Sequence, residues 1–298
     1  MIINEVIKPE ARRGQMHPTG LVVTDLDGTL MRSDGTIHSN DLKTLEDLGT
    51  YGIVRAIATG RSLYSFSRSV DRPLPVDFII FSTGAAILKY PEGVMMRSVN
   101  LEAREVQFII RVFKQHRLHF MVHRGAPDNH LFAYHQPEGP NPDFVRRIEL
   151  YHEVCWPLDS DAAPFDQAAQ VIAVVPETMG DKVFNLIQEQ LDEFNVIRTT
   201  SPLDGASMWI EVFPKNVSKS LSTAWLASEL GIDAEYVMAV GNDYNDMDLL
   251  LWSGASYVVD NAPEDLKRRF ASVASNDNAG VTEAVNRWLG LNPIQCIR

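Results

Sequence analysis

Two aspartates stand close together directly after a short apolar run near the start of the chain. The run is Leu21 to Thr24, and Asp25-Leu26-Asp27-Gly28-Thr29-Leu30 follows it. Two carboxylates this close favour a bound cation or a shared proton, because both resist being charged side by side. A turn whose aspartates accept local backbone hydrogen bonds is the alternative, and for this pair alone it is the simpler interpretation. An EF-hand loop is excluded, since the glycine comes too early and a strand pattern precedes it.

A hydroxyl and a run of backbone N–H groups come together at Thr59-Gly60-Arg61, where the apolar run 53–58 ends. Backbone N–H groups at the start of a helix bind anions, so this segment is suited to a phosphate. Capping of the following helix by Thr59 is the alternative, and the three residues do not separate the two.

Two lysines, Lys215 and Lys219, lie near the start of a helix predicted over about 217–230. A cation in the first turn opposes the helix dipole, which indicates a functional reason for a lysine there. An exposed surface lysine explains the same pattern, and both explanations stay open on the residues alone.

Oxygen-bearing side chains are concentrated in the loop from Gly241 to Asp246, directly after another apolar run. Asn242, Asp243 and Asn245 add amide and carboxylate oxygens to that of Asp246, and such oxygens are the ligands of a hard cation such as Mg²⁺. The alternative is that Asn245 or Asp243 only caps the next helix.

Apolar runs alternate with amphipathic helices at both ends of the chain, and this alternation predicts the elements that position the four segments. The N-terminal part predicts strands over 21–24, 53–58 and 78–81, with Ser39 as the N-cap of a helix over about 40–51. The C-terminal part predicts strands over 236–240 and 256–259 and helices over 217–230, 245–252 and 281–289. The pattern is typical of an α/β fold with a parallel sheet, in which ligands bind at the carboxyl edge of the strands.

The middle of the chain has a different pattern, with helices and hairpin-like strands mixed together. We therefore expect an inserted α+β domain over 86–213, a core built from 19–85 and 214–298, and a loose N-terminal extension over 1–18.

The amino-acid composition excludes some classes of function. The chain has 39 acidic and 27 basic residues, so bulk attraction to a nucleic-acid backbone is excluded. Apolar stretches are too short to span a bilayer, the first twenty residues contain no secretory apolar segment, and the two cysteines form no paired motif. We expect a cytoplasmic protein that binds neither nucleic acid nor membrane; the sequence does not indicate an oligomeric state.

In this order, the four segments resemble the motifs of the haloacid dehalogenase superfamily of phosphohydrolases. The long stretch between the second and third segments resembles the inserted cap of the Cof-like, type IIB members. The resemblance implies a Rossmann-like parallel-sheet core with a C2B-type α+β cap, and a phosphatase that acts on small phosphorylated metabolites, sugar phosphates first.

The same resemblance assigns roles to individual residues. Asp25 would be the nucleophile that forms an aspartyl-phosphate, and Asp27 the general acid and base. Lys219, rather than Lys215, would hold the nucleophile and the transferring group. The phosphate contacts would be Thr59, Gly60, Arg61, Lys219 and Asn245, and the Mg²⁺ ligands would be Asp25, Asp27, Asn242 and Asp246.

Two positions depart from the family pattern. Asn242 stands where relatives usually have a metal-binding aspartate, so we expect weakened metal affinity and retained activity. Thr83-Gly84 stands where relatives tend to have Asn-Gly. Two other functions remain as alternatives: a phosphomutase-type phosphotransferase, and a catalytically silent phosphate-binding or regulatory module.

Overall fold

The computed structural model describes residues 18–70, 72–201 and 203–290, and the chain divides into two compact units. The first unit consists of Met1–Thr59, Ser69–Met96 and Lys219–Arg298, and the second of Gly60–Arg68 and Arg97–Ser218. Nearly all of the expected N-terminal extension lies outside the described residues.

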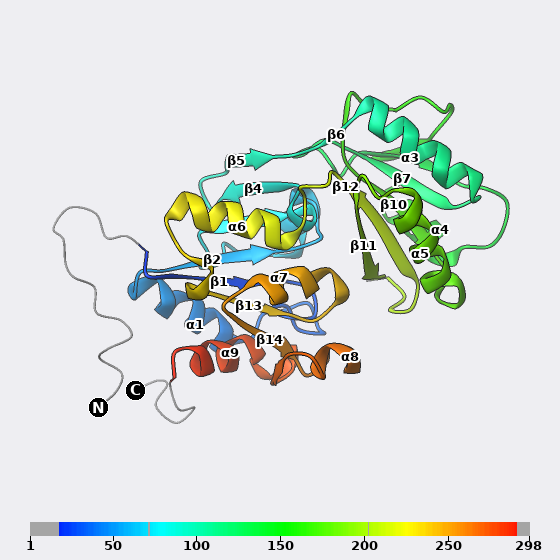
Figure 1. The fold of residues 1–298 in the computed structure, drawn as a ribbon. Helices are drawn as coiled ribbons and strands as arrows, with labels where there is room; N and C mark the ends of the chain where they lie inside the picture. Colours follow the sequence, from blue (N-terminus) through cyan, green and yellow to red (C-terminus); the bar gives the residue numbers. More distant parts are fainter. Residues whose placement is uncertain (1–17, 71, 202, 291–298) are drawn as a thin grey trace. The chain divides into compact units, whose positions relative to one another are not determined.

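The first unit is built on a mainly parallel sheet (Figure 1). In the described part of the chain this sheet has eight strands, in the order β15-β14-β13-β1-β2-β3-β4-β5. All neighbours from β15 to β3 are parallel, and β4 is antiparallel to β3. The bounds are β1 Gly20–Thr24, β2 Ile53–Ala58, β3 Phe78–Phe81, β4 Ala86–Lys89, β5 Val94–Ser98, β13 Val237–Gly241, β14 Ala255–Val259 and β15 Ala271–Val273.

Helices cover both faces of this sheet. Helices α6 and α7 pack on one face and α1 and α9 on the other (Figure 1). Leu21 and Val23 of β1 are fully buried, in one apolar cluster with Leu226 of α6 and Leu249 of α7. The bounds are α1 Ser39–Thr50, α6 Lys219–Leu230, α7 Met247–Trp252, α8 Glu264–Lys267 and α9 Gly280–Trp288. The predicted α/β class is therefore confirmed.

The second unit contains a mainly antiparallel sheet in the order β11-β12-β10-β7-β8-β9, with β6 paired to β10. Apolar residues of α3 and α5 pack on one face of this sheet, and Phe144 of α4 packs on the other. The strands are β6 Leu101–Glu102, β7 His119–Arg124, β8 Phe132–His135, β9 Cys155–Pro157, β10 Gln167–Val175, β11 Asn195–Thr200 and β12 Met208–Phe213. The helices are α2 Leu63–Ser69, α3 Ala103–Gln115, α4 Pro142–Leu150 and α5 Gly180–Gln190.

Some local predictions differ from the structure. The N-cap of α1 is His38, whose side chain accepts a hydrogen bond from the backbone N–H of Asn40, and Ser39 is already inside the helix. β4 and most of β5 group with the first unit, because β4 pairs along its whole length with β3. Among the helices that the structure describes, none is long and apolar enough to cross a bilayer.

Candidate active site

The carboxyl ends of three adjacent parallel strands define the site. β1 lies between β13 and β2, and the register pairs Thr24 with Val240 on one side and with Ile57 on the other. The three strands therefore end at the same level. Asp25 follows β1, Thr59 follows β2, and the loop from Asn242 follows β13, so the topology brings three of the four predicted segments to one sheet edge.

The fourth segment meets the first through an ion cluster. The Nζ atom of Lys219 lies 2.7 Å from Oδ1 of Asp25 and 2.6 Å from Oδ1 of Asp246. Lys219 and Asp246 are fully buried, and Asp25 is 5 % exposed. Lys219 is the first residue of α6, where the helix dipole disfavours a cation, and the two carboxylates supply the compensating charge.

Burial and neighbouring charges shift the pKa values of Asp25 and Lys219. Burial raises the pKa of Asp25 to about 7, the Asp246 and Asp27 carboxylates act in the same direction, and the Lys219 ammonium opposes them. Burial alone lowers the pKa of Lys219, but the charges of Asp246 and Asp25 outweigh it and hold that pKa above its usual range. Lys219 therefore remains an ammonium at neutral pH, and any further cation near Asp25 would favour its ionised form.

Asp246 organises the loop after β13. While one carboxylate oxygen receives Lys219, Oδ2 accepts hydrogen bonds from the backbone N–H groups of Asn242, at 2.8 Å, and Asp243, at 3.1 Å. A Cβ atom on Gly241 would lie 2.6 Å from this carboxylate, so only glycine leaves room for it. Both oxygens of Asp246 are thus engaged by groups of the protein.

The turn after β1 depends on a glycine. Gly28 has a φ of +72°, and a Cβ atom there would lie 2.6 Å from Nδ2 of Asn242. The glycine therefore lets the Asn242 side chain approach the turn that carries Asp25 and Asp27. The hydroxyl of Thr29 lies 3.1 Å from the amide oxygen of Asn242.

Thr59 is buried where β2 ends. Its backbone N–H donates to the carbonyl of Ile80 at 2.8 Å, and its carbonyl accepts from the N–H of Thr83 at 3.0 Å. Thr83 has a φ of +54°, a left-handed conformation that is uncommon outside glycine. Ser222 of α6 donates to the carbonyl of Gly84 at 2.6 Å, which ties the helix that begins with Lys219 to this bend.

The remaining predicted residues fall in different places. Asn245 is buried in the short 3₁₀ turn before α7. Gly60 and Arg61 group with the second unit, where Arg61 donates to the hydroxyl of Ser65 at 3.4 Å. Lys215 also groups with the second unit, and its Nζ donates to the carbonyl of Asp192 at 2.7 Å. The lysine that contacts the aspartate of the first segment is therefore Lys219.

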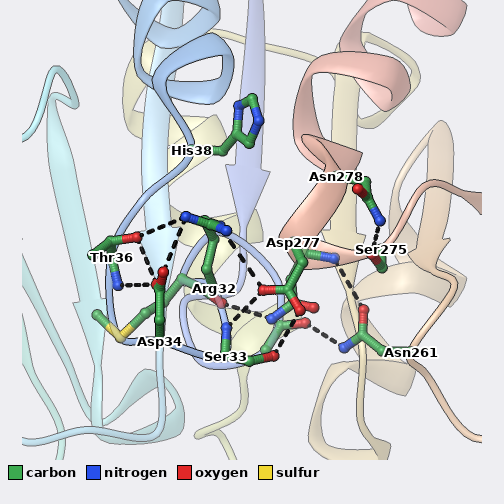
Figure 2. Close-up of polar contacts among 12 residues, drawn as sticks. Arg32, Ser33, Asp34, Thr36, His38, Asn261, Ser275, Asp277 and Asn278 are labelled. Atoms are coloured by element: carbon green, nitrogen blue, oxygen red, sulfur yellow. Dashed lines mark hydrogen bonds and ion pairs between the residues drawn. The ribbon is translucent and has the colours of Figure 1, made fainter.

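A set of supporting residues was missed by the sequence analysis. Asn261 donates to the carbonyl of Gly28 at 2.8 Å and accepts from the N–H of Asn276 at 3.0 Å (Figure 2). Asn276 in turn donates to the carbonyl of Met31 at 3.0 Å. These amides fix the backbone on both sides of Thr29, and no local pattern predicts pairs that are more than 230 residues apart in the chain.

A second set of contacts extends this support (Figure 2). The carboxylate of Asp277 accepts from the backbone N–H and the hydroxyl of Ser33, both at 2.9 Å. Arg32 forms an ion pair with Asp34 at 3.0 Å, and its Nε lies 3.9 Å from Asp277. The segment around Asp277 therefore holds the loop that leads from the turn of residues 25–29 to α1.

The oxygens near Asn242 are the candidate ligands for a metal. Oδ2 of Asp25 and the carbonyl of Asp27 lie 3.2 and 3.1 Å from one terminal atom of the Asn242 amide. Within the described ranges, no three His, Cys, Asp or Glu side chains form a metal-binding group. A cation here would rest on one carboxylate, one carbonyl and one amide, a hard-oxygen set that fits Mg²⁺ with little negative charge.

Comparison with known proteins identifies relatives along nearly the whole chain. The profile of the haloacid dehalogenase-like hydrolases matches residues 22–285. Phosphatase YwpJ of Bacillus subtilis is 23% identical over 90% of this chain and 99% of its own length. The 5-amino-6-(5-phospho-D-ribitylamino)uracil phosphatase YitU of the same species is 22% identical, over 91% of this chain and 98% of its own.

Solved structures share the fold. A structure described as the subclass IIB sugar phosphatase BT4131 superposes with a TM-score of 0.71, at 19% identity, over 91% of this chain and 99% of its own. At this identity the likeness establishes the architecture, a parallel-sheet core with an inserted cap.

Proposed function

Because the chain belongs to the haloacid dehalogenase-like hydrolase family and is a phosphoric monoester hydrolase, we propose that Asp25 is its nucleophile in Mg²⁺-dependent hydrolysis of small organic monophosphates. The observation that carries this proposal is the buried cluster of Asp25, Lys219 and Asp246 at the carboxyl edge of the parallel sheet. We assign the first unit as the phosphohydrolase core and the second as the substrate-selecting cap.

In the first step, an oxygen of Asp25 attacks phosphorus and forms an aspartyl-phosphate. The bond between phosphorus and the leaving oxygen breaks, and the proton of Asp27 passes to that oxygen, so the product leaves as an alcohol. Lys219 stays positively charged throughout and stabilises the charge that spreads over the transferring group.

In the second step, water hydrolyses the aspartyl-phosphate. Asp27, now ionised, takes a proton from the water as its oxygen bonds to phosphorus, and the bond between phosphorus and Asp25 breaks. Inorganic phosphate leaves, Asp25 is again a carboxylate, and Asp27 is again protonated for the next substrate.

The oxygens around Asn242 fit a magnesium ion. Asp25, the carbonyl of Asp27 and the amide oxygen of Asn242 would hold it, with water completing its coordination. When bound, Mg²⁺ supplies positive charge that neutralises the phosphoryl oxygens. Lys219 and two backbone N–H groups bind the oxygens of Asp246, so we assign Asp246 to positioning Lys219 and the loop, and it also remains a predicted Mg²⁺ ligand.

Thr59, at the carboxyl edge of the parallel sheet, is the first candidate for contact with the phosphate. The buried Thr59 lies where β2 ends, and its hydroxyl is our candidate donor to a phosphoryl oxygen. Gly60 and Arg61 follow it directly in the chain and remain predicted phosphate contacts, as does the buried Asn245.

Sugar phosphates are our first candidate substrates. One structural neighbour is described as a sugar phosphatase, and YitU is named as a 5-amino-6-(5-phospho-D-ribitylamino)uracil phosphatase. The shared architecture is the support for carrying this class over to the present chain.

A panel of phosphorylated metabolites, assayed for phosphate release with and without EDTA, tests the proposal. We expect Mg²⁺-dependent release by the wild type and a loss of about 10³-fold or more in Asp25→Asn. Asp47→Asn is the matched control, because Asp47 lies on the surface of α1 in an ion pair with Lys43. Retained turnover in Asp25→Asn would eliminate the proposed nucleophile.

The same assay separates the alternatives. Phosphate release in the absence of any acceptor alcohol argues against a phosphomutase-type enzyme. A folded protein that turns over neither p-nitrophenyl phosphate nor any metabolite at any Mg²⁺ concentration would support the silent phosphate-binding module instead.

A further inference from the structure

The end of the Asn242 side chain lies among three oxygens of the catalytic turn. With its NH₂ group facing them, the amide donates to Oδ2 of Asp25 at 3.2 Å, to the carbonyl of Asp27 at 3.1 Å and to the hydroxyl of Thr29 at 3.1 Å. In the opposite orientation the amide oxygen faces the ionised carboxylate of Asp25 and the carbonyl of Asp27, which cannot donate to it, and Thr29 supplies the hydrogen. Hydrogen bonding therefore favours the orientation with NH₂ toward the turn.

Two independent features hold the side chain there. The backbone N–H of Asn242 donates to the buried carboxylate of Asp246 at 2.8 Å, which fixes the start of the loop. Gly28, with its positive φ, carries no side chain where a Cβ would lie 2.6 Å from the other terminal atom of the Asn242 amide. The loop and the turn are thus shaped around the end of this side chain.

The charges nearby explain why a neutral donor is suitable at this place. Lys219 is shared between Asp25 and Asp246, and Asp27 adds another carboxylate close to Asp25. A carboxylate at position 242 would add negative charge to this group and would bring no hydrogen for the three oxygens. An amide adds no charge and points two N–H groups at them.

We propose that, when no cation is bound, the NH₂ group of Asn242 holds Asp25, the carbonyl of Asp27 and Thr29 in place of a metal ion. When a cation binds, the amide turns over, so that its oxygen faces the cation and its NH₂ group faces away. The first half depends only on the contacts of the turn, and the second half rests on the proposed magnesium-dependent function.

Thermal unfolding in EDTA tests the first half without any turnover. We expect the Tm of Asn242→Asp and of Asn242→Ala to fall by about 5 °C or more, because both lose the donated hydrogen bonds. Asn278→Asp is the matched control for the added charge, since Asn278 lies in an exposed turn and donates to the hydroxyl of Ser275. Asn278→Asp should have the same Tm as the wild type.

Two outcomes would overturn the first half. If both Asn242 variants melt with the wild type in EDTA, the amide does not hold the turn. If only the aspartate variant is destabilised, charge repulsion is the whole effect and the hydrogen bonds contribute nothing.

NMR of the side-chain amides tests the second half. The ¹⁵N–¹H₂ pair of Asn242 is identified as the one missing from Asn242→Asp, and Mg²⁺ is added to the protein without substrate. We expect this pair to shift and to saturate at the Mg²⁺ concentrations that support turnover. An Asn242 pair that does not move over that range would refute the reorientation.

The two measurements also separate this inference from the proposed function. A protein that melts and shifts as expected but releases phosphate from no monophosphate would keep the amide assignment and lose the phosphatase mechanism. Mg²⁺-dependent turnover together with an unmoved amide pair would keep the phosphatase mechanism and refute the reorientation of the Asn242 amide.

Discussion

Lys219 and Asp25 are 194 residues apart in the chain, and their Nζ and Oδ1 atoms lie 2.7 Å apart in the interior of the protein. Lys219 is also bound to Asp246 at 2.6 Å, so one ammonium serves both the predicted nucleophile and the loop after β13. Removal of this charge would leave two buried carboxylates without a counter-ion.

We therefore expect Lys219→Met to lower kcat by about 10²–10³-fold, because methionine keeps the length of the side chain and removes its charge. Lys215→Met is the control, since Lys215 binds the carbonyls of Asp192 and Phe194. Steady-state kinetics with p-nitrophenyl phosphate, with circular dichroism to confirm folding, would check this. A larger loss of kcat in Lys215→Met than in Lys219→Met would show that Lys215, and not Lys219, is the catalytic cation.

Asn242→Asp should strengthen magnesium binding. A carboxylate supplies a full negative charge to the cation where the amide supplies a dipole, and we expect the Mg²⁺ concentration for half-maximal activity to fall by about tenfold. Titration of Mg²⁺ at saturating substrate measures this directly. An unchanged or higher requirement would show that residue 242 does not contact the metal.

Asn276→Ala should destabilise the loop that follows the turn of residues 25–29. Asn276 is buried and donates to the carbonyl of Met31, so alanine leaves that carbonyl unpaired and should lower the free energy of unfolding by about 1–3 kcal/mol. Urea unfolding followed by fluorescence measures the change. Asn278→Ala, in the exposed part of the same turn, is the control, and an equal effect in both variants would contradict the assignment.

His123 should make the protein sensitive to acid. Burial lowers the pKa of this histidine from 6.5 to about 3, and its Nδ1 is bonded to the carbonyl of Asn129 at 2.8 Å. The unfolded chain binds a proton as the pH falls below 6.5, whereas the folded protein does not. The stabilising contribution of neutral His123 is thus present above pH 6.5 and is lost toward pH 3.

Urea unfolding at several pH values would check this. Between pH 6.5 and about pH 5, the free energy of unfolding should fall by about 2 kcal/mol more in the wild type than in His123→Gln, or about 1.4 kcal/mol for each pH unit. The exposed His152 provides the control variant His152→Gln, which should follow the wild type. If the free energy of unfolding changes with pH in the same way in the wild type and in His123→Gln, then His123 is not held neutral in the folded protein.

The sequence was informative wherever local pattern decides structure. Apolar runs at 21–24 and 53–58 correspond to β1 and β2, and the alternation of strand and helix identified the parallel sheet that brings Asp25 and Thr59 to one edge. Strand β15 was missed, because its three residues carry too little pattern and are defined by pairing with β14.

Long-range contacts could not be predicted in the same way. The sequence predicts Asp246 as a metal ligand, and only the folded chain shows that its oxygens also bind Lys219 and backbone N–H groups. Asn261 and Asn276 lie in ordinary polar turns, and their contacts with Gly28 and Met31 depend on how distant segments fold together.

The support that Asn261, Asn276 and Asp277 give to the loop from Gly28 to Ser33 also sets an order of events during synthesis. The ribosome makes Gly28, Met31 and Ser33 each more than 230 residues before the partner that binds it. A nascent chain therefore contains the proposed nucleophile Asp25 early, and the contacts that support its turn form only after Asn261, Asn276 and Asp277 have been made.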